Sequence, residues 1–485
     1  MSAGLADVQR IVLRGTPWQA ARHLLIDFCG KSPLRALNLL LQHLPPASAG
    51  AAANPRVQIS LGLTRRGLEH AWVPDHVLAS LALKAPAFWS GAALRAASQL
   101  GMAGRNAPTN WEPHFAYGAV DAVLSLHADD TKALRRILVE IKSEARTAGL
   151  RLVALPAAAA LKAPAGMADK GGARPQWVHF GFLDGLSRVG IKGRPSESAQ
   201  AGSDPSSRHE AGEFVLGHLQ DSGANPWVSG PGLRVWPEEV REFFHNGSFG
   251  VLQQIQQEVR AFEDYVADKA KASGLDVREL KGKLCGRYPD GLPLAAPDAK
   301  DPRADFGYVA DPDGMRCPFG SHIRRMNPRR HRLADGPAPQ GPALGHDEDL
   351  AHFSRSRALL RRGMPYGPAW ARGATGSEPE RGLIGQFFCA SIEDQYEHLL
   401  GQWAERVPMG SADAGGARDP LIGSHDLRDG PFQIPRQGQP PRILDDLQPF
   451  IQTRGVAYLF YPSLSTLRGI ADHRVWLPQD KGGDE

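Results

Sequence analysis

Cysteine is scarce in this sequence and irregularly placed. The 485 residues contain four cysteines, Cys29, Cys285, Cys317 and Cys389, and no two of them have the CxxC spacing of an iron–sulfur or zinc motif. Reduced thiols in a cytoplasmic protein are therefore expected, rather than a disulfide framework or a clustered metal site.

Long apolar runs and an excess of one charge are also missing. No run of about 18 apolar residues occurs, which argues against a membrane-spanning helix. The opening stretch "MSAGLADVQRIVLRG" has no basic start followed by an apolar segment, as a secretory leader would. Lys and Arg total 56 against 52 Asp and Glu, a formal charge of +4, which is too balanced for a dedicated nucleic-acid binder or membrane-surface protein. The expected partner is a small molecule.

The periodicity of apolar residues indicates two α+β halves. In the first half, strands are expected at 23–28, 57–63, 118–128 and 150–155, with helices starting at Pro33 and Thr131. This is the strand, helix, strand pattern of a split βαβ unit, written twice, with helices over an antiparallel sheet. In the second half, a strand is expected at 381–390 and a helix capped by Ser391. The stretch "NGSFGVLQQIQQEVRAFEDYV" is expected to begin as a turn and short strand. It is then expected to continue as a helix with one face formed by Val251, Leu252, Ile255, Val259, Phe262 and Val266.

Two segments of small and polar residues separate these halves. One follows Leu155 and the other covers residues 196–212; both are expected to be loops. The predicted organisation is an N-terminal ferredoxin-like domain (1–178), a linking segment (179–212) and a C-terminal ferredoxin-like domain (213–485).

Three short stretches carry residues suited to chemistry. "GFLDG" (181–185) holds Asp184 between glycines, "RCPFGSHIRRMNPRRHR" (316–332) places His322 among arginines, and "LLRRGMPYG" (359–367) contains Arg361. A neutral imidazole can ligate iron, and arginines suit carboxylates such as haem propionates. Each stretch alone has a plainer explanation: a histidine in an anion site or packed loop, or a solvated arginine pair.

In combination and in this order, the three stretches resemble the signature of the dye-decolourising (DyP-type) peroxidase family of haem proteins. "GEFVLGHLQ", "GKLCGRYPDGLPL" and "ERGLIGQFFCASIEDQYEHLLGQW" are similar to that family too. The resemblance covers nearly the whole chain and is nearest to the long-chain branch. It implies an α+β fold of two ferredoxin-like halves, of the dimeric α/β-barrel type, with antiparallel sheets flanked by helices.

The resemblance also implies a cofactor and a site. Haem b is expected in the C-terminal half, with His322 as the proximal iron ligand, Arg325 as a propionate contact, and Asp184 and Arg361 on the distal side. Asp419 in "DPLIG" is a candidate for the carboxylate that hydrogen-bonds the other nitrogen of His322.

The implied reaction oxidises aromatic compounds such as dyes and phenolics with hydrogen peroxide, through an oxyferryl intermediate. A carboxylate can move the proton from one peroxide oxygen to the other, and Arg361 can stabilise the departing oxygen. With Asp184 as the acid-base group, activity is expected to be best at acidic pH.

One departure from the family pattern concerns the distal face. Where the family usually reads something like "GLLFLC", this chain has "GLIGQFFC", which places Leu383, Gly385 and Phe387 around the expected haem. A glycine at 385, followed by Gln386, would open space above the iron. Alternatively, a bulge would put Phe387 or Phe388 into that space.

Aromatic residues of the C-terminal half could relay electrons from bulky substrates. Trp370, Trp403, Tyr366 and Tyr396 are the candidates, although Tyr396 and Trp403 fall on an apolar helix face and are more simply core residues.

Two other functions stay open from the sequence. One is a haem-binding or haem-handling protein with low turnover, and the other is a haem-free oligomeric scaffold. The oligomeric state, monomer or homo-oligomer, is not set by the sequence.

Overall fold

The computed structural model describes most of the chain. The described residues are 3–15, 18–29, 33–44, 56–164, 167, 176–186, 189–192, 208–228, 236–304, 306–328, 354–373, 377–406, 417–426 and 430–473. Most of the 196–212 segment and the end of the stretch 316–332 lie outside them.

A single antiparallel sheet system forms the centre of the molecule. Its N-terminal strands are β1 (Ala20–Asp27), β2 (Val57–Leu63), β3 (Ala122–Ala128), β4 (Arg151–Ala154) and β5 (Ala158–Ala159). Its C-terminal strands are β10 (Ser248–Gln257), β11 (Leu360–Arg361), β12 (Met364–Tyr366), β13 (Gly382–Cys389) and β16 (Ile451–Tyr461).

The strands close into a barrel. The order β10, β16, β2, β3, β1, β5, β12, β13 returns to β10 because β10 also pairs with β13. Two short links join the halves: Phe460 pairs with Leu63, and Tyr366 pairs with Ala158. Within each half the order is that of a ferredoxin-like unit, with β4, β1, β3, β2 in the first and β16, β10, β13, β11/β12 in the second. The predicted fold class is confirmed.

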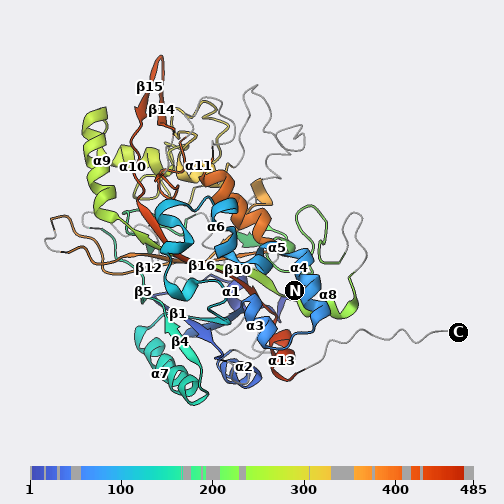
Figure 1. Cartoon of the computed structure of the whole chain (residues 1–485). Coiled ribbons are helices and arrows are strands. Elements are labelled where there is room, and N and C mark those ends of the chain that lie inside the picture. The colour runs from blue at the N-terminus through green and yellow to red at the C-terminus, as the bar shows by residue number, and fades with distance from the viewer. Residues whose placement is uncertain are drawn as a thin grey trace.

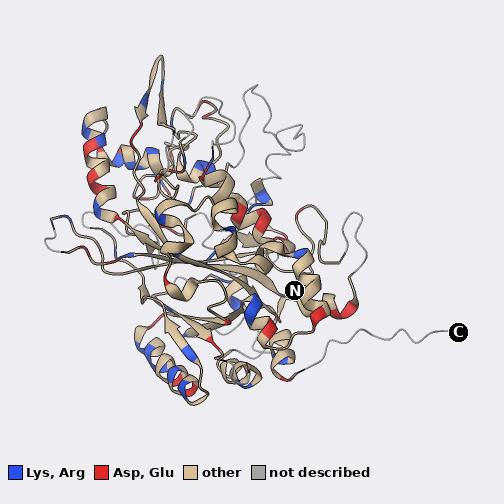
Figure 2. Ribbon diagram, viewed as in Figure 1, with Lys and Arg blue, Asp and Glu red and all other residues tan. Residues whose placement is uncertain are grey.

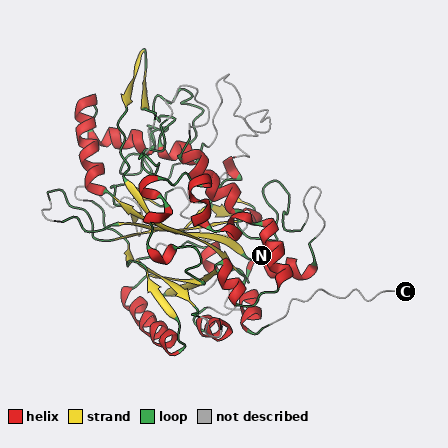
Figure 3. Ribbon diagram, viewed as in Figure 1, coloured by secondary structure: helices red, strands yellow, loops and turns green. Residues whose placement is uncertain are grey.

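Helices cover the outside of the barrel (Figure 1, Figure 3). In the first half these are α1 (Arg10–Leu13), α2 (Pro33–Leu41), α3 (Arg65–His70), α4 (Asp75–Lys84), α5 (Pro86–Ser90), α6 (Ala92–Gln99) and α7 (Thr131–Thr147). In the second half they are α8 (Glu238–Phe244), α9 (Val259–Ser273), α10 (Val277–Cys285), α11 (His322–Met326), the π-helical turns η7 (Ile392–Glu397) and η8 (Leu399–Ala404), and α13 (Leu464–Ala471).

Among the described residues, three short two-stranded pairs lie outside the barrel. β6 (Gln176–Trp177) is antiparallel to β7 (Leu183–Asp184), β8 (Gly190–Ile191) is parallel to β9 (Arg208–His209), and β14 (Phe432–Arg436) is antiparallel to β15 (Gln439–Leu444). The β14–β15 hairpin projects from the top of the molecule in Figure 1. Basic and acidic residues are mixed along α7 and α9 (Figure 2).

Local signals in the sequence set several boundaries. Pro33 starts α2, α7 starts at Thr131 behind the Asp130 cap, and the Ser391 side chain accepts the amide of Asp394. The predicted helix through Val251, Leu252 and Ile255 is wrong, because these residues lie in β10 and the helix α9 starts only at Val259. β10 pairs along its length with both β13 and β16, and this sheet pairing overrides the helical spacing.

Two apolar clusters hold the layers together. The larger includes side chains of both halves, such as Leu24, Leu124, Phe249 and Phe460. The second lies around α9 and α10 and includes Phe180 and Phe182 of the β6–β7 hairpin. The predicted domain boundaries at 178 and 212 stay a prediction.

Among the described residues, no helix has both the length and the apolar character needed to cross a bilayer.

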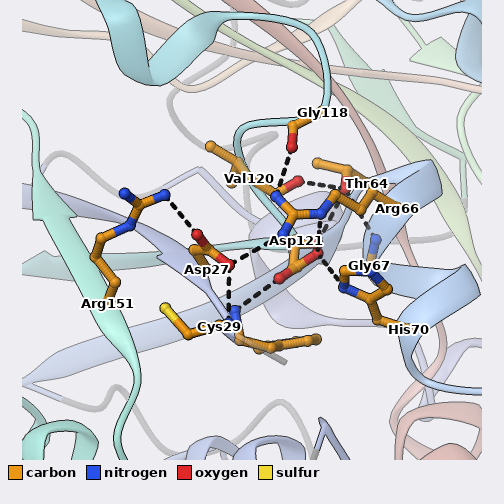
Figure 4. A network of polar contacts seen from close by, with 11 residues as sticks. Asp27, Cys29, Thr64, Arg66, Gly67, His70, Gly118, Val120, Asp121 and Arg151 are labelled. Carbon is orange, nitrogen blue, oxygen red and sulfur yellow. Dashed lines mark hydrogen bonds and ion pairs between the residues drawn. The ribbon is translucent and has the colours of Figure 1, made fainter. Parts of the chain in front are cut away.

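A network of charges ties β1, α3 and β3 together (Figure 4). Asp121 is fully buried, and its carboxylate accepts the amide of Phe28 at 2.6 Å and pairs with Arg66 at 3.3 Å and His70 at 2.9 Å. Arg66 also contacts Asp27 at 3.1 Å. Burial raises the pKa of Asp121 although the Phe28 amide, Arg66 and His70 oppose the rise. Arg66 is therefore the cation that contacts both Asp27 and Asp121.

Arg66→Ala is expected to lower the free energy of unfolding by roughly 2 kcal/mol. A fully buried pair would cost about 3–5 kcal/mol to break, but Arg66 is partly exposed and His70 remains. Urea denaturation at neutral pH measures the loss. Arg135→Ala, on the exposed face of α7, is the control and should change little. Equal losses in both variants would contradict the role of the network.

Candidate active site

His322 is the first residue of α11 and is held by a buried carboxylate. Its Nδ1 lies 2.9 Å from Oδ2 of Asp419, which has no exposed surface, while the histidine side chain is 25% exposed. The Ser321 hydroxyl, just before it, donates to the carbonyl of Lys283 at 2.5 Å and fixes the start of the helix on α10. The partner suggested for His322 from sequence is thus in hydrogen-bonding contact with it.

The environment of Asp419 favours its ionised form. Its Oδ1 accepts the amides of Leu421 at 2.9 Å and Ile422 at 3.1 Å. Burial alone would raise the pKa of Asp419, but His322, Arg325 and the Leu421 amide outweigh it and lower the pKa. A carboxylate can only accept, so Nδ1 of His322 carries the proton. The lone pair of Nε2 is left for a ligand bond.

The structure places Arg325, the expected propionate contact, in buried surroundings, and the propionate role stays a prediction. The side chain is only 4% exposed. Its guanidinium donates to main-chain carbonyls of Gly320 (3.3 Å), Trp403 (2.8 Å), Ala404 (3.2 Å), Arg406 (2.8 Å) and Ala417 (2.5 Å). Four of these carbonyls, those of Trp403, Ala404, Arg406 and Ala417, lie N-terminal to Asp419 in the chain, and that of Gly320 lies just before His322. Arg325 therefore positions the carboxylate behind His322, and its donors are directed away from solvent.

Asp184 ends the β6–β7 hairpin. Gly181 and Gly185 have φ angles of +80° and +73°, a backbone region that residues other than glycine rarely adopt. The hairpin is closed by the amide of Val178, which donates to Phe182 at 3.1 Å, and by Leu183, whose amide donates to Pro289 at 2.9 Å. The Asp184 side chain is exposed and makes no hydrogen bond or ion pair with any residue that the structure describes.

Arg361 lies on the sheet face formed by β11 and β13. It is exposed and stands directly opposite Phe387. The pairing continues without a shift through Pro365, which is opposite Leu383. Because side chains alternate along a strand, Arg361, Phe387 and Leu383 share one face, and the neighbouring Arg362 points to the other. Arg362 donates to the carbonyls of Ile11 and Val12 in α1.

Gly385 is on the same sheet face as Arg361. The sequence left open whether the space at Gly385 is empty or is filled by Phe387 or Phe388 through a bulge. A Cβ at this position would lie 2.7 Å from the ring of Phe387, so that ring covers the glycine. β13 pairs with β10 without a bulge in this region. Phe387 in turn packs on Tyr396, with ring centroids 5.4 Å apart. Gln386 points to the opposite side, where its amide donates to Ser125 at 2.8 Å and Tyr461 at 2.9 Å.

Sequence reasoning missed Gly363. The continuous pairing places it opposite Gly385, so two glycines face each other between Arg361 and Pro365. The signal was present in "RRGMPYG", but reading it required the strand register. The core interpretation of Tyr396 and Trp403 is confirmed, since they are 1% and 6% exposed. Tyr366 is also buried, and Trp370 is partly exposed.

The candidate site residues lie in three places in the fold. His322 and Asp419 are in direct contact, and Arg361, Leu383, Gly385 and Phe387 share one sheet face. The hairpin bearing Asp184 packs in the apolar cluster around α9 and α10. This cluster also includes Leu421, with Ile323 and Ile422 packed against it, and these residues are close in sequence to His322 and Asp419.

Known proteins similar to this chain belong to one group. A dye-decolourising peroxidase of Auricularia auricula-judae is 25% identical over 96% of this chain and 86% of its own length. A multifunctional dye peroxidase of Amycolatopsis is 28% identical over 75% of this chain and 74% of its own length. No family model matches the chain.

Solved structures give the same result for the fold. A DyP-type peroxidase of Anabaena superposes with a TM-score of 0.73 at 20% identity, covering 96% of this chain and 94% of the other. A dye-decolourising peroxidase in complex with 2,6-dimethoxyphenol superposes with a TM-score of 0.72 at 22% identity, covering 96% and 99%.

The comparisons define the class of protein first: the chain is similar to peroxidases. Within that class its relatives and its fold are of the dye-decolourising, DyP type, as the motifs indicated.

The residues present fit a haem. The Nδ1 proton of His322 is held by a buried carboxylate, which leaves Nε2 as a neutral ligand atom, and its side chain is partly exposed. Leu383 and Phe387 offer apolar surface on the sheet face, and both are partly exposed. Asp184 and Arg361 add one carboxylate and one guanidinium.

Arg325→Met is expected to destabilise the haem-free protein by about 3 kcal/mol, because buried carbonyls lose their charged donor. Thermal and urea unfolding of the apoprotein measure this loss. Arg316→Met, on the same segment but exposed, should behave like the wild type. If Arg325 acted only as a propionate contact, apoprotein stability would be unchanged and haem affinity alone would fall.

Proposed function

We propose that this protein is a haem b peroxidase that uses hydrogen peroxide to oxidise small aromatic compounds such as dyes and phenols. The observation that carries the proposal is the pair formed by His322 and the buried Asp419 at 2.9 Å. A haem bound at Nε2 of His322 supplies the redox chemistry. The carboxylate behind the imidazole makes it a stronger electron donor, a feature that suits a peroxidase.

Asp184 is the proposed acid-base group. Hydrogen peroxide held on the side away from His322 must lose a proton from one oxygen and gain one on the other before its O–O bond breaks. The Asp184 carboxylate takes the first proton and delivers it to the outer oxygen, directly or through a water. Its exposure and its lack of a partner among the described side chains leave both carboxylate oxygens available for this transfer.

Arg361 is proposed to stabilise the oxygen that departs. The pairing of β11 with β13 places Arg361 on the same sheet face as Leu383 and Phe387. From this position its guanidinium can stabilise the negative charge that develops on the departing oxygen.

The sheet face favours a peroxidase over a haem-binding protein with little turnover. That alternative rested on Gly385 and Gln386 remodelling the distal side. Phe387 covers Gly385, and Gln386 points into the barrel, so the face keeps an apolar ring where the sequence suggested open, polar space.

The haem-free scaffold alternative has no comparable support. The relatives act as peroxidases by name, and one structural neighbour was solved with 2,6-dimethoxyphenol. We propose phenols of this kind as reductants. A cytoplasmic location and the oligomeric state stay predictions.

Asp184→Asn is expected to lower the rate constant for reaction with hydrogen peroxide by about 10²- to 10⁴-fold, because the amide cannot accept the proton. Arg361→Ala is expected to lower it by about 10²- to 10³-fold. Stopped-flow absorbance at the Soret band measures both, followed by steady-state oxidation of 2,6-dimethoxyphenol.

The exposed residues Asp298 and Arg372 provide matched controls, as Asp298→Asn and Arg372→Ala. Both should react like the wild type. Variants at Asp184 and Arg361 that bind haem normally and still react at the wild-type rate would refute the assigned roles.

A further inference from the structure

The inner wall of the barrel is polar where β1, β2 and β3 meet. Gln58 is directly opposite His127, Ser60 is opposite Ser125, and Ser125 is also opposite His23. Side chains two residues apart share a face, so these five form one continuous patch. Each is at most 3% exposed. This patch, the inner polar patch, lies where a barrel core is ordinarily apolar.

The opposite wall of the barrel contacts this patch through Gln386 of β13. Its Nε2 donates to Ser125 Oγ at 2.8 Å and to the Tyr461 hydroxyl at 2.9 Å. His23 Nδ1 also contacts Ser125 Oγ, at 2.9 Å. The patch therefore faces the barrel interior and connects the N-terminal strands to β13.

Several polar atoms of the patch have no protein partner. Gln58 Nε2 and Oε1, Ser60 Oγ, His127 Nδ1 and Gln386 Oε1 are buried and make no hydrogen bond to any residue described in the structure. Buried polar atoms almost always have a partner, protein or water. Leaving so many unpaired on adjacent residues would be a large cost for a protein of ordinary stability.

The chemistry of these atoms points to a neutral occupant. The amide and hydroxyl groups of Gln58, Ser60 and Gln386 supply both donors and acceptors. Burial lowers the pKa of His127 to about 4, with a contribution from Arg362, so its ring is uncharged at neutral pH. Burial also lowers the pKa of His23. A mixture of neutral donors and acceptors around one place suits water, which needs two to four polar partners.

We propose that the barrel interior holds a cluster of ordered water molecules, about two in number, bound by Gln58, Ser60, His127 and Gln386. The waters complete the bridge that Gln386 begins between the two halves. They lie behind the part of β13 whose other face carries Gly385 and Phe387, so they support that face from the barrel side.

Ser60→Ala tests the proposal by the sign of its effect. If Ser60 binds water, losing the hydroxyl lowers the thermal unfolding midpoint by about 1–3 °C. If the interior is dry, the hydroxyl is an unpaired polar group, and removing it leaves the midpoint unchanged or raises it. Ser125→Ala is the matched control, because Ser125 has protein partners and should lose stability in either case.

Gln58→Met, which keeps the length of the side chain, should lower the midpoint in the same way, and a rise would overturn the proposal. A high-resolution crystal structure of the full chain should show density for water within hydrogen-bonding distance of Gln58 and His127. Native mass spectrometry tests the alternative that a small organic molecule fills the barrel interior. The added mass of such a molecule would overturn the proposal. None of these measurements depends on peroxidase activity.

Discussion

The hydrogen bond between His322 and Asp419 is the interaction on which the account of this protein depends. It selects the tautomer of the histidine and so determines which nitrogen is free to bind a ligand. A buried carboxylate needs strong compensation, and the fold supplies it from two main-chain amides and from Arg325. Arg325 donates to the carbonyls of Trp403 and Ala417, which both lie N-terminal to Asp419 in the chain. The histidine is thus positioned by a set of contacts that spans nearly 100 residues of chain.

The barrel separates two environments with one strand. One side of β13 presents Leu383, Gly385 and Phe387 together with Arg361 of β11. The other side presents Gln386 to the inner polar patch. Because neighbouring residues alternate, a glycine that seemed to open the site and a glutamine that seemed to make it polar act on different sides. Two links of one residue pair each close the barrel, so cross-barrel contacts such as that of Gln386 add to the connection between halves.

Much of the fold could be predicted, and site residues could be proposed, because both rest on local signals. The bounds of β2, the start of α7, the Ser391 cap and the motifs around Asp184, His322 and Arg361 are all written within short stretches. What failed depends on distant partners. The residues of β10 have helical spacing but are paired on both sides. The carbonyls around Arg325 likewise come from distant parts of the chain. The direction of Gln386 follows from strand register, which no short stretch reveals.

The most direct test of the central claim concerns the iron ligand. Resonance Raman spectroscopy of the ferrous haem protein should show an iron–histidine stretching band in the wild type, and His322→Gly should lack it. Adding imidazole to that variant should restore a band, because the added ring can occupy the space beside Asp419. A His322→Gly variant that keeps the wild-type band without imidazole would contradict the assignment of His322, and with it the proposed function of the pair.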